Sequence, residues 1–244
     1  MRNIKLKLEF DGTFYAGWQR QINGIAVEQK VREAIKKLTG EEPDLIGCSR
    51  TDAGVHARRY ICSFKTECTI PAVRMKFALN NILKDDIVVL ESDEVYEEFH
   101  ARFSARWKRY TYTICNREIP PAIGRNYVYF FKRALNTDSM EAAAAFLVGK
   151  HDFSSFKNAN SVVRSNVRTI FDLNVSRIGD MITISVTGDG FLYNMVRIIA
   201  GTLIEVGLGH ISPEDMENIL ESKDRKKAGR TAPASGLCLE EVFY

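Results

Sequence analysis

The sequence has no long apolar stretch. None of its 244 residues falls in a run of the roughly 18 to 20 consecutive apolar residues that a membrane-spanning helix requires. Its first ten residues, MRNIKLKLEF, alternate basic and apolar positions as a strand does, and they do not resemble a signal peptide. We therefore expect a soluble protein that makes no contact with a membrane.

Cysteine and histidine are both scarce. The five cysteines form no C-x-x-C pair, and their odd number makes a poor disulfide framework for a chain of this size. The four histidines are far apart and form no H-x-x-x-H or H-x-E pattern. We expect a protein of the reducing cytoplasm that holds neither a structural nor a catalytic metal.

The charge balance is close to neutral, and its distribution is more informative than its sum. A net charge of +3 does not by itself indicate a nucleic-acid partner. Residues 85–98 carry seven acids and no cation, whereas 100–109 carry four cations and no acid. Two further basic clusters lie at 223–230 and at Lys157, Arg164 and Arg168. Basic segments interleaved with aromatic residues suit RNA, although ordinary solvated faces would look the same.

Hydrophobic periodicity divides the first half into alternating elements. Apolar residues at every second position predict a strand over 4–10, and helical spacing predicts a helix over 27–38 that Gly40 closes. Short strands at 45–46 and 60–64 bracket a loop at 47–57. A helix near 72–83 and a strand at 87–90 follow.

The second half repeats this order. It contains a predicted strand at 109–115, a helix from Asp138 to Val148, a hairpin of 171–175 with 181–186, an apolar helix from Phe191 to Val206 and a short helix ending near Glu221. Asp138 and Glu141 resemble a capping box, and Ser212 is the expected cap of the last helix. We predict an α+β fold of two ferredoxin-like or RRM-like halves, 1–104 and 105–244. They would share a largely antiparallel mixed sheet, with helices on one side and an active-site cleft between the halves.

The loop from Ser49 to Ala57 is the first candidate for chemistry. It places the carboxylate of Asp52 and the guanidinium of Arg50 beside a glycine, between two strands. Loops held by a rigid sheet often carry catalytic groups. An aspartate before Ala-Gly is also a common turn residue that satisfies its own backbone, so this segment alone does not settle the matter.

Arg197 is the second candidate, because it lies within an otherwise apolar helical run. Burying an unpaired guanidinium costs several kcal/mol, and the only acid in the same run, Glu205, is eight residues or about 12 Å away along a helix. A carboxylate from elsewhere, such as Asp52, is a suitable partner and would be kept ionised as a nucleophile. Alternatively, Arg197 extends to solvent or binds backbone carbonyls.

The segment from Phe99 to Tyr112 alternates cations with aromatic residues. Its cations, among them Arg102, Arg106 and Arg109, could bind phosphates while an aromatic ring stacks on an extruded base. Tyr110 and Tyr112 could equally be one buried face of a strand. His56 and His151 are candidates for acid–base work or for holding loops. Gly188-Asp189-Gly190 lacks the third glycine of a dinucleotide-binding fingerprint.

Together these residues resemble the tRNA pseudouridine synthase A family. The resemblance spans the whole chain in six blocks, namely 10–21, 49–57, 99–114, 149–156, 188–209 and 228–244. It implies that Asp52 in Arg-Thr-Asp-Ala-Gly-Val-His is the nucleophile and that Arg197 in Met-Val-Arg pairs with it. It also implies that Tyr110 stacks on the target base and that Arg50 helps to hold that nucleotide out of the RNA stack.

The resemblance further implies a reaction and a set of partners. The expected reaction isomerises uridine to pseudouridine at nucleotides 38, 39 and 40 of the tRNA anticodon stem-loop, without a cofactor or metal. The expected assembly is a homodimer in which one tRNA contacts both subunits. Cys48, next to the motif, and Cys238 depart from the family pattern without touching the chemistry.

Three alternatives remain beside this hypothesis. A non-catalytic tRNA-binding or folding module would not require a carboxylate among phosphate-binding groups, where it would repel the ligand. A small-molecule enzyme that uses Asp52 as acid or base would leave the basic clusters unexplained. A paralogue that modifies other tRNA uridines could retain all of these motifs.

Overall fold

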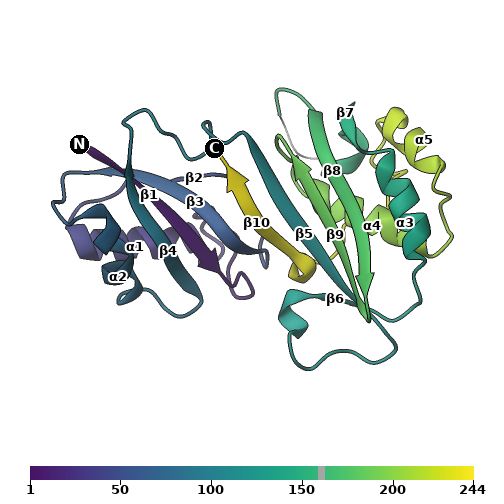
Figure 1. Ribbon diagram of the computed structural model, residues 1–244, viewed down its shortest axis with the longest axis horizontal. Coiled ribbons are helices and arrows are strands. Elements are labelled where there is room, and N and C mark those ends of the chain that lie inside the picture. The colour runs from purple at the N-terminus through teal and green to yellow at the C-terminus, as the bar shows by residue number, and fades with distance from the viewer. Residues whose placement is uncertain (159–162) are drawn as a thin grey trace. The chain divides into compact units, whose positions relative to one another are not determined.

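The computed structural model describes residues 1–158 and 163–244. The chain forms two compact units, of which unit 1 comprises Met1–Arg106 with Cys238–Tyr244, and unit 2 comprises Trp107–Leu237 (Figure 1). The predicted boundary at 104/105 lies close to the end of the first segment of unit 1. Within the described residues, no helix has the length and apolar character needed to span a membrane.

Unit 1 is built on a sheet in the order β4-β1-β3-β10, with β2 paired to β3. Its strands are β1 (Arg2–Phe10), β2 (Ile46–Gly47), β3 (His56–Thr66), β4 (Ile87–Val95) and β10 (Leu237–Phe243). β1 lies antiparallel to both β3 and β4, and only β10 runs parallel to its neighbour β3. Alternate β1 residues Ile4, Leu6, Leu8 and Phe10 are buried, as their spacing predicts.

Two helices complete unit 1. Helix α1 (Val27–Thr39) buries Val27, Val31 and Ile35, and Gly40 ends it in the left-handed conformation at φ 77°, as predicted. Helix α2 (Ala72–Asn80) is shorter than the predicted 72–83 and packs on β4. The order β-α-β-β-α-β over residues 1–95 therefore agrees with the sequence prediction.

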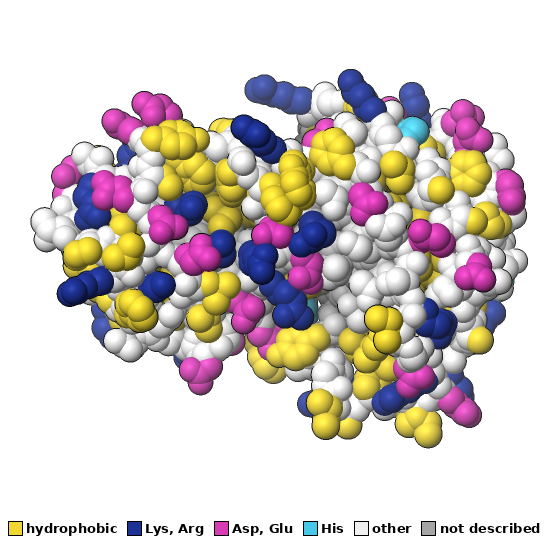
Figure 2. Space-filling model, viewed as in Figure 1, with side chains coloured by type: hydrophobic (Ala, Val, Ile, Leu, Met, Phe, Trp, Pro, Cys, Tyr) yellow, Lys and Arg dark blue, Asp and Glu magenta, His cyan; other side chains and the backbone are white. Residues whose placement is uncertain are grey.

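Ion pairs explain the acid-rich stretch at 85–98. Its strand β4 lies beside β1, so Glu91 and Asp93 come within 2.7 and 3.4 Å of Lys7 and Lys5. The contact with Lys7 lowers the pKa of Glu91 from its ordinary value. Figure 2 shows acidic and basic side chains intermixed on the visible face. Part of the expected charge segregation is thus neutralised by cross-strand pairing.

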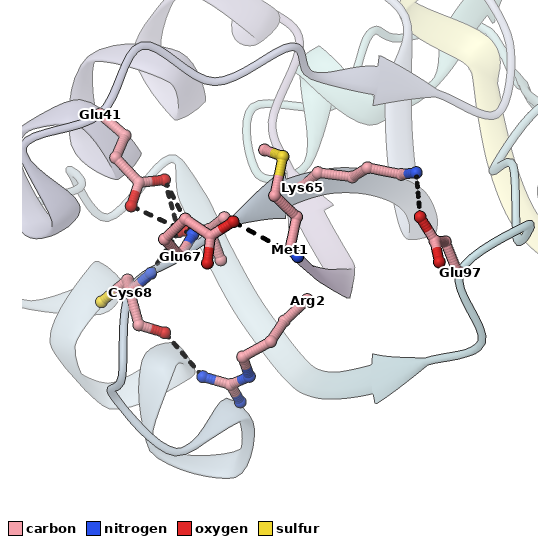
Figure 3. Close-up of polar contacts among 8 residues, drawn as sticks. Met1, Arg2, Glu41, Lys65, Glu67, Cys68 and Glu97 are labelled. Atoms are coloured by element: carbon pink, nitrogen blue, oxygen red, sulfur yellow. Dashed lines mark hydrogen bonds and ion pairs between the residues drawn. The ribbon is translucent and has the colours of Figure 1, made fainter.

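Further polar contacts secure the end of β3 and the start of β1 (Figure 3). The Arg2 guanidinium donates to the Cys68 carbonyl at 2.7 Å. The Glu41 carboxylate, which follows α1, accepts from the Thr66 hydroxyl at 2.6 Å and from the Glu67 backbone N–H. These contacts join the segment after α1 to the sheet.

Unit 2 contains an antiparallel sheet in the order β5-β9-β8-β7, and β6 pairs with β5 in parallel. The strands are β5 (Trp107–Asn116), β6 (Tyr129–Phe131), β7 (Gly149–Asp152), β8 (Val167–Ile178) and β9 (Met181–Gly188). The predicted hairpin is confirmed, since β8 and β9 join at Gly179, which has φ 57°. The α+β class with mostly antiparallel pairing is also confirmed.

Helices α3 (Thr137–Ala145), α4 (Met195–Gly207) and α5 (Asp215–Ser222) belong to unit 2, with 3-10 turns η1 (Arg125–Tyr127), η2 (Ser154–Phe156) and η3 (Ala234–Gly236). The predicted capping box of α3 is wrong: Asn136 caps the helix by accepting from Ser139 N at 3.1 Å, and Glu141 instead accepts from Val175 N. Helix α5 begins at Asp215, and Glu214 at its N-cap makes no side-chain cap hydrogen bond, so the predicted start at Ser212-Pro213 is wrong. Ser212 instead exchanges hydrogen bonds with Asp215 just before the helix.

The predicted start of the apolar helix at Phe191 is also wrong. Asn194 has φ 62°, which is left-handed and cannot continue a right-handed helix, so α4 begins at Met195. The apolar pattern that extends back to Leu192 reflects burial of that side chain and does not indicate a helix. Arg197 consequently lies in the first turn of α4.

Candidate active site

In unit 1, the Asp52 loop fills the connection between β2 and β3. Val55 N donates to the Asp52 carbonyl at 3.2 Å, and Gly54 adopts φ 79°, which closes a tight turn. Thr51 is buried, Asp52 is half-buried and Arg50 is exposed. The turn therefore holds the carboxylate of Asp52 and the guanidinium of Arg50 two residues apart on a short, fixed piece of backbone.

The segment from Asp11 to Trp18 packs directly against this loop. Trp18 N donates to the Thr51 carbonyl and Gly54 N donates to the Tyr15 carbonyl, both at 3.2 Å. A Cβ on Gly12 would lie 2.0 Å from the Val55 oxygen, and one on Gly17 would lie 2.3 Å from the Thr51 oxygen. Only glycine permits this approach of two backbones.

Two aromatic side chains support the start of the loop. Tyr60 on β3 is fully buried, stacks on Trp18 with ring centroids 4.0 Å apart, and donates its phenol to the Ser49 carbonyl. Trp18 binds the Thr51 carbonyl through its backbone. The two residues therefore fix the backbone on both sides of Arg50.

His56 closes the other end of the loop. His56 is 5% exposed, and its Nδ1 lies 3.1 Å from both the Gly12 nitrogen and the Asp11 carboxylate. Unprotonated Nδ1 accepts from Gly12, whereas protonated Nδ1 donates to Asp11, so each contact belongs to a different proton position. Either way, His56 ties the loop to the end of β1. Nearby, burial together with the carboxylate of Asp86 raises the pKa of Tyr15.

Two of the predicted phosphate-binding arginines also belong to unit 1. Arg102 and Arg106 are both exposed. The Arg102 guanidinium lies over the ring of Phe103, and Arg106 N donates to the Phe243 carbonyl at 2.8 Å. Both cations are accessible to a charged ligand.

In unit 2, Tyr110 and Arg109 lie on β5. Tyr110, Tyr112 and Ile114 share a buried face of the strand, and Tyr110 is 7% exposed. The Tyr110 ring meets Phe191 edge-on at 5.2 Å. The arrangement fits the strand-face alternative, and it also gives Tyr110 a fixed ring orientation.

Arg197 is half-buried in the first turn of α4. A cation there is disfavoured by the positive end of the helix dipole and needs acceptors. Nε donates to the Ala232 carbonyl at 2.8 Å, and one Nη donates to Asn194 Oδ1 at 2.9 Å. Arg197 thus binds a backbone carbonyl, which was one of the alternatives to an ion pair that its sequence context allowed. The ion pair with Asp52 stays a prediction.

The residues of the basic cluster at 223–230 differ in role: some make contacts within the fold, and others are exposed. Arg225 donates to the Ala228 and Gly229 carbonyls, and burial lowers its pKa, so it holds the turn together. Lys223 and Arg230 lie 3.5 and 3.9 Å from Asp152 and Glu205. Lys226 and Lys227 are exposed. In the thinner cluster, Arg168 donates to the Ser165 carbonyl.

The supporting residues of the loop were not predicted from the sequence. Tyr60, Trp18 and the two close-contact glycines were not assigned roles, although the spacing of Gly12, Gly17 and Trp18 in the first block is a usable signal.

His151 contacts the Val148 carbonyl at 3.0 Å, a local contact that holds its turn. In the described part of the chain, no three His, Cys, Asp or Glu residues are grouped so as to hold a metal ion.

Residues 143–244 match a family model described as tRNA pseudouridine synthase. The chain is 53% identical over 244 residues to proteins named tRNA pseudouridine synthase A from Clostridium kluyveri and Clostridium acetobutylicum, and 50% identical to one from Acetivibrio thermocellus, with 100% of each chain covered. A chain of a solved Cbf5–Nop10–Gar1 complex aligns at 11% identity and a TM-score of 0.40, over 95% of this chain and 50% of that one. On the full-length identities, the chain belongs to the tRNA pseudouridine synthase A family.

Proposed function

We propose that this enzyme isomerises uridine to pseudouridine at nucleotides 38, 39 and 40 of the tRNA anticodon stem-loop, with Asp52 as the nucleophile. The observation that carries the proposal is the Asp52 loop, whose backbone is fixed by Trp18, Tyr15 and Tyr60. A nucleophile must be held within a narrow range of positions to react, and this loop meets that requirement.

The reaction requires two bonds to break and two to form. The N1–C1′ bond of the uridine breaks, the uracil rotates, a C5–C1′ bond forms, the C5 proton leaves and N1 gains a proton. The Asp52 carboxylate serves either by adding to C6 of the ring or by assisting cleavage at C1′. Neither route consumes an oxidant or a cofactor.

The remaining site residues act on the substrate. Extruding a base from an RNA stack costs a few kcal/mol, which contacts with the protein must offset. In this proposal Tyr110 stacks on the target uracil, Arg50 holds the nucleotide out, and Arg197 orients Asp52. Arg102, Arg106 and Arg109 contact phosphates. A homodimer in the cytoplasm, with one tRNA contacting both subunits, remains the expected assembly.

Release of tritium from C5 tests the proposal. The substrates are tRNA transcripts labelled at uracil C5, each with a single uridine at position 38, 39 or 40, and one control transcript with uridine only elsewhere. Wild-type enzyme should release tritium from the first three. Asp52→Asn should release none while its tRNA Kd stays within about threefold, because the substitution keeps the size of the side chain and removes the nucleophile.

Each other outcome has a definite meaning. Release by Asp52→Asn would remove that residue from its role. Binding without release by the wild type would favour a non-catalytic module, and release from the control transcript would favour a paralogue with other target positions.

A further inference from the structure

Phe103 is an exposed aromatic ring that the proposed chemistry does not use. Phe103 is 75% exposed, and it lies in unit 1 directly after Arg102. Isolated exposed apolar residues are common and carry no meaning by themselves. The surroundings of Phe103 distinguish it from such residues.

The turn that carries Phe103 is fixed by four hydrogen bonds. His100 Nδ1 accepts from the backbone N–H groups of Arg102 and Phe103, both at 3.2 Å. Ser104 N donates to the His100 carbonyl at 2.9 Å, and its hydroxyl accepts from His100 N at 3.1 Å. The backbone that carries the ring is therefore fixed before any ligand binds, which lowers the entropic cost of a contact.

Contacts with the sheet of unit 1 hold this turn in place. Ala101 is fully buried, its N–H donates to the Ser63 hydroxyl on β3 at 3.3 Å, and its carbonyl accepts from the Tyr244 phenol at 2.6 Å. The turn is thus attached at its second residue to a strand and to the C-terminal residue. Phe103 projects from a rigid base.

A guanidinium and an imidazole lie against the ring. The Arg102 guanidinium lies 5.6 Å from the centre of the Phe103 ring, and the His100 ring lies 4.3 Å from it at an interplanar angle of 31°. Arg106 is exposed two residues beyond the turn. Rings beside guanidinium groups suit unpaired nucleotides, whose bases stack while their phosphates attract the cations.

We propose that Phe103, with His100 and Arg102, forms a second stacking platform that binds an unpaired tRNA base other than the target uridine. The inference rests on the proposed function and extends it, because Tyr110 is assigned to the target base. The platform contributes to tRNA affinity and leaves the chemical step alone. A site outside the reacting nucleotide has this effect when it binds ground state and transition state equally.

Substitution of Phe103 tests this platform in the full-length enzyme. Phe103→Ala should raise the tRNA Kd and KM about 10-fold, with kcat at saturating tRNA within about twofold of wild type. Phe103→Tyr and Phe103→Trp should retain wild-type Kd, because they keep an aromatic face. Phe103→Leu should behave as Phe103→Ala does. Thermal unfolding of every variant checks that the fold is retained.

Phe77→Ala is the matched control. Phe77 lies on α2 in the same unit, is 64% exposed, and has the Lys76 ammonium 5.1 Å from its ring centre. It shares exposure and a cation but lacks the fixed turn, so its loss should leave tRNA Kd unchanged.

The outcomes separate this inference from the proposed function. If the wild type releases tritium from tRNA and Phe103→Ala has the same Kd and KM as Phe77→Ala, the proposal of a second stacking platform is wrong and the proposed function stands. A wild type that releases none fails the proposed function. If Phe103→Ala leaves tRNA binding unchanged but shifts the oligomeric state in gel filtration, the ring contacts a second copy of the chain and the RNA platform is overturned.

Discussion

Two glycines in left-handed conformations, Gly17 and Gly40, allow the effect of backbone strain to be distinguished from the effect of contact with the Asp52 loop. Gly17 has φ 87° and would place a Cβ 2.3 Å from the Thr51 oxygen and 3.0 Å from the Asp52 carbonyl carbon. Gly40 has φ 77°, and nothing lies within 4 Å of its Cβ position. Alanine at either site meets the same unfavourable backbone conformation, which costs about 1 to 2 kcal/mol. Only alanine at Gly17 must also displace the loop.

We predict that Gly17→Ala lowers kcat by at least about tenfold, because a displacement of the nucleophile near 1 Å is enough to do so. Gly40→Ala should lower the free energy of unfolding by about 1 kcal/mol and leave kcat unchanged. Tritium release and urea unfolding of both variants measure the two effects. Equal kcat in the two variants would show that the packing of Gly17 on the loop does not set the position of Asp52.

At the scale of an element, the turn after β7 depends on one carboxylate. Asp152 accepts from the Ser154 hydroxyl at 2.6 Å and from its backbone N–H at 3.0 Å, and it lies 3.5 Å from the Lys223 ammonium. These contacts, the Ser154 hydroxyl foremost, lower the pKa of Asp152. Because the folded-state pKa is the lower one, the stabilisation is present above the ordinary carboxyl range and disappears as the pH falls through the folded-state pKa.

We predict that Asp152→Asn lowers the Tm at pH 7 by about 1 to 2 °C, a small effect because the carboxylate is partly screened by solvent. The difference from wild type should narrow as the pH is lowered below about 4. Lys223→Met should lower the Tm less, since Lys223 is a smaller cause of the shift. Calorimetry from pH 7 to pH 3 measures the difference, and a gap that stays constant over this range would contradict the assignment.

Strong periodicity was the reliable guide to elements, and weak or competing signals were not. The alternation of Ile4, Leu6 and Leu8 and the spacing along α1 predict β1 and α1, because each buries one face. The short strand β6 has only three residues, too few to show a period, and was not predicted. The start of α4 was misplaced because Asn194 stops the helix through backbone conformation, which hydrophobicity does not reveal.

At the scale of the whole molecule, the proposed chemistry draws on both units. Unit 1 carries Asp52 and Arg50, whereas unit 2 carries Arg197, Tyr110 and Arg109. Sequence patterns identify each set separately, because each lies in a recognisable block. They do not determine which acceptors a guanidinium binds, and the Ala232 carbonyl and Asn194 side chain were not foreseen.

Arg197 and Arg177 provide a matched comparison within unit 2. Each arginine donates to an asparagine side-chain oxygen and to a backbone carbonyl: Arg197 to Asn194 and Ala232, Arg177 to Asn116 and Leu135. Replacing either by methionine removes a charge and at least these two hydrogen bonds. Similar losses of stability are therefore expected from the two substitutions, each about 1 to 3 kcal/mol.

Their effects on catalysis should differ. If Arg197 orients the Asp52 carboxylate, Arg197→Met should lower kcat on the order of 100-fold while tRNA Kd rises less than about threefold. Arg177→Met should change neither by more than about twofold, because its contacts lie within unit 2 and hold β8 to the segment around Leu135. Single-turnover tritium release at saturating tRNA, with Kd measured separately, distinguishes the two. A proportional loss of kcat and affinity in Arg197→Met would mean that Arg197 binds RNA or supports the fold instead of positioning the nucleophile.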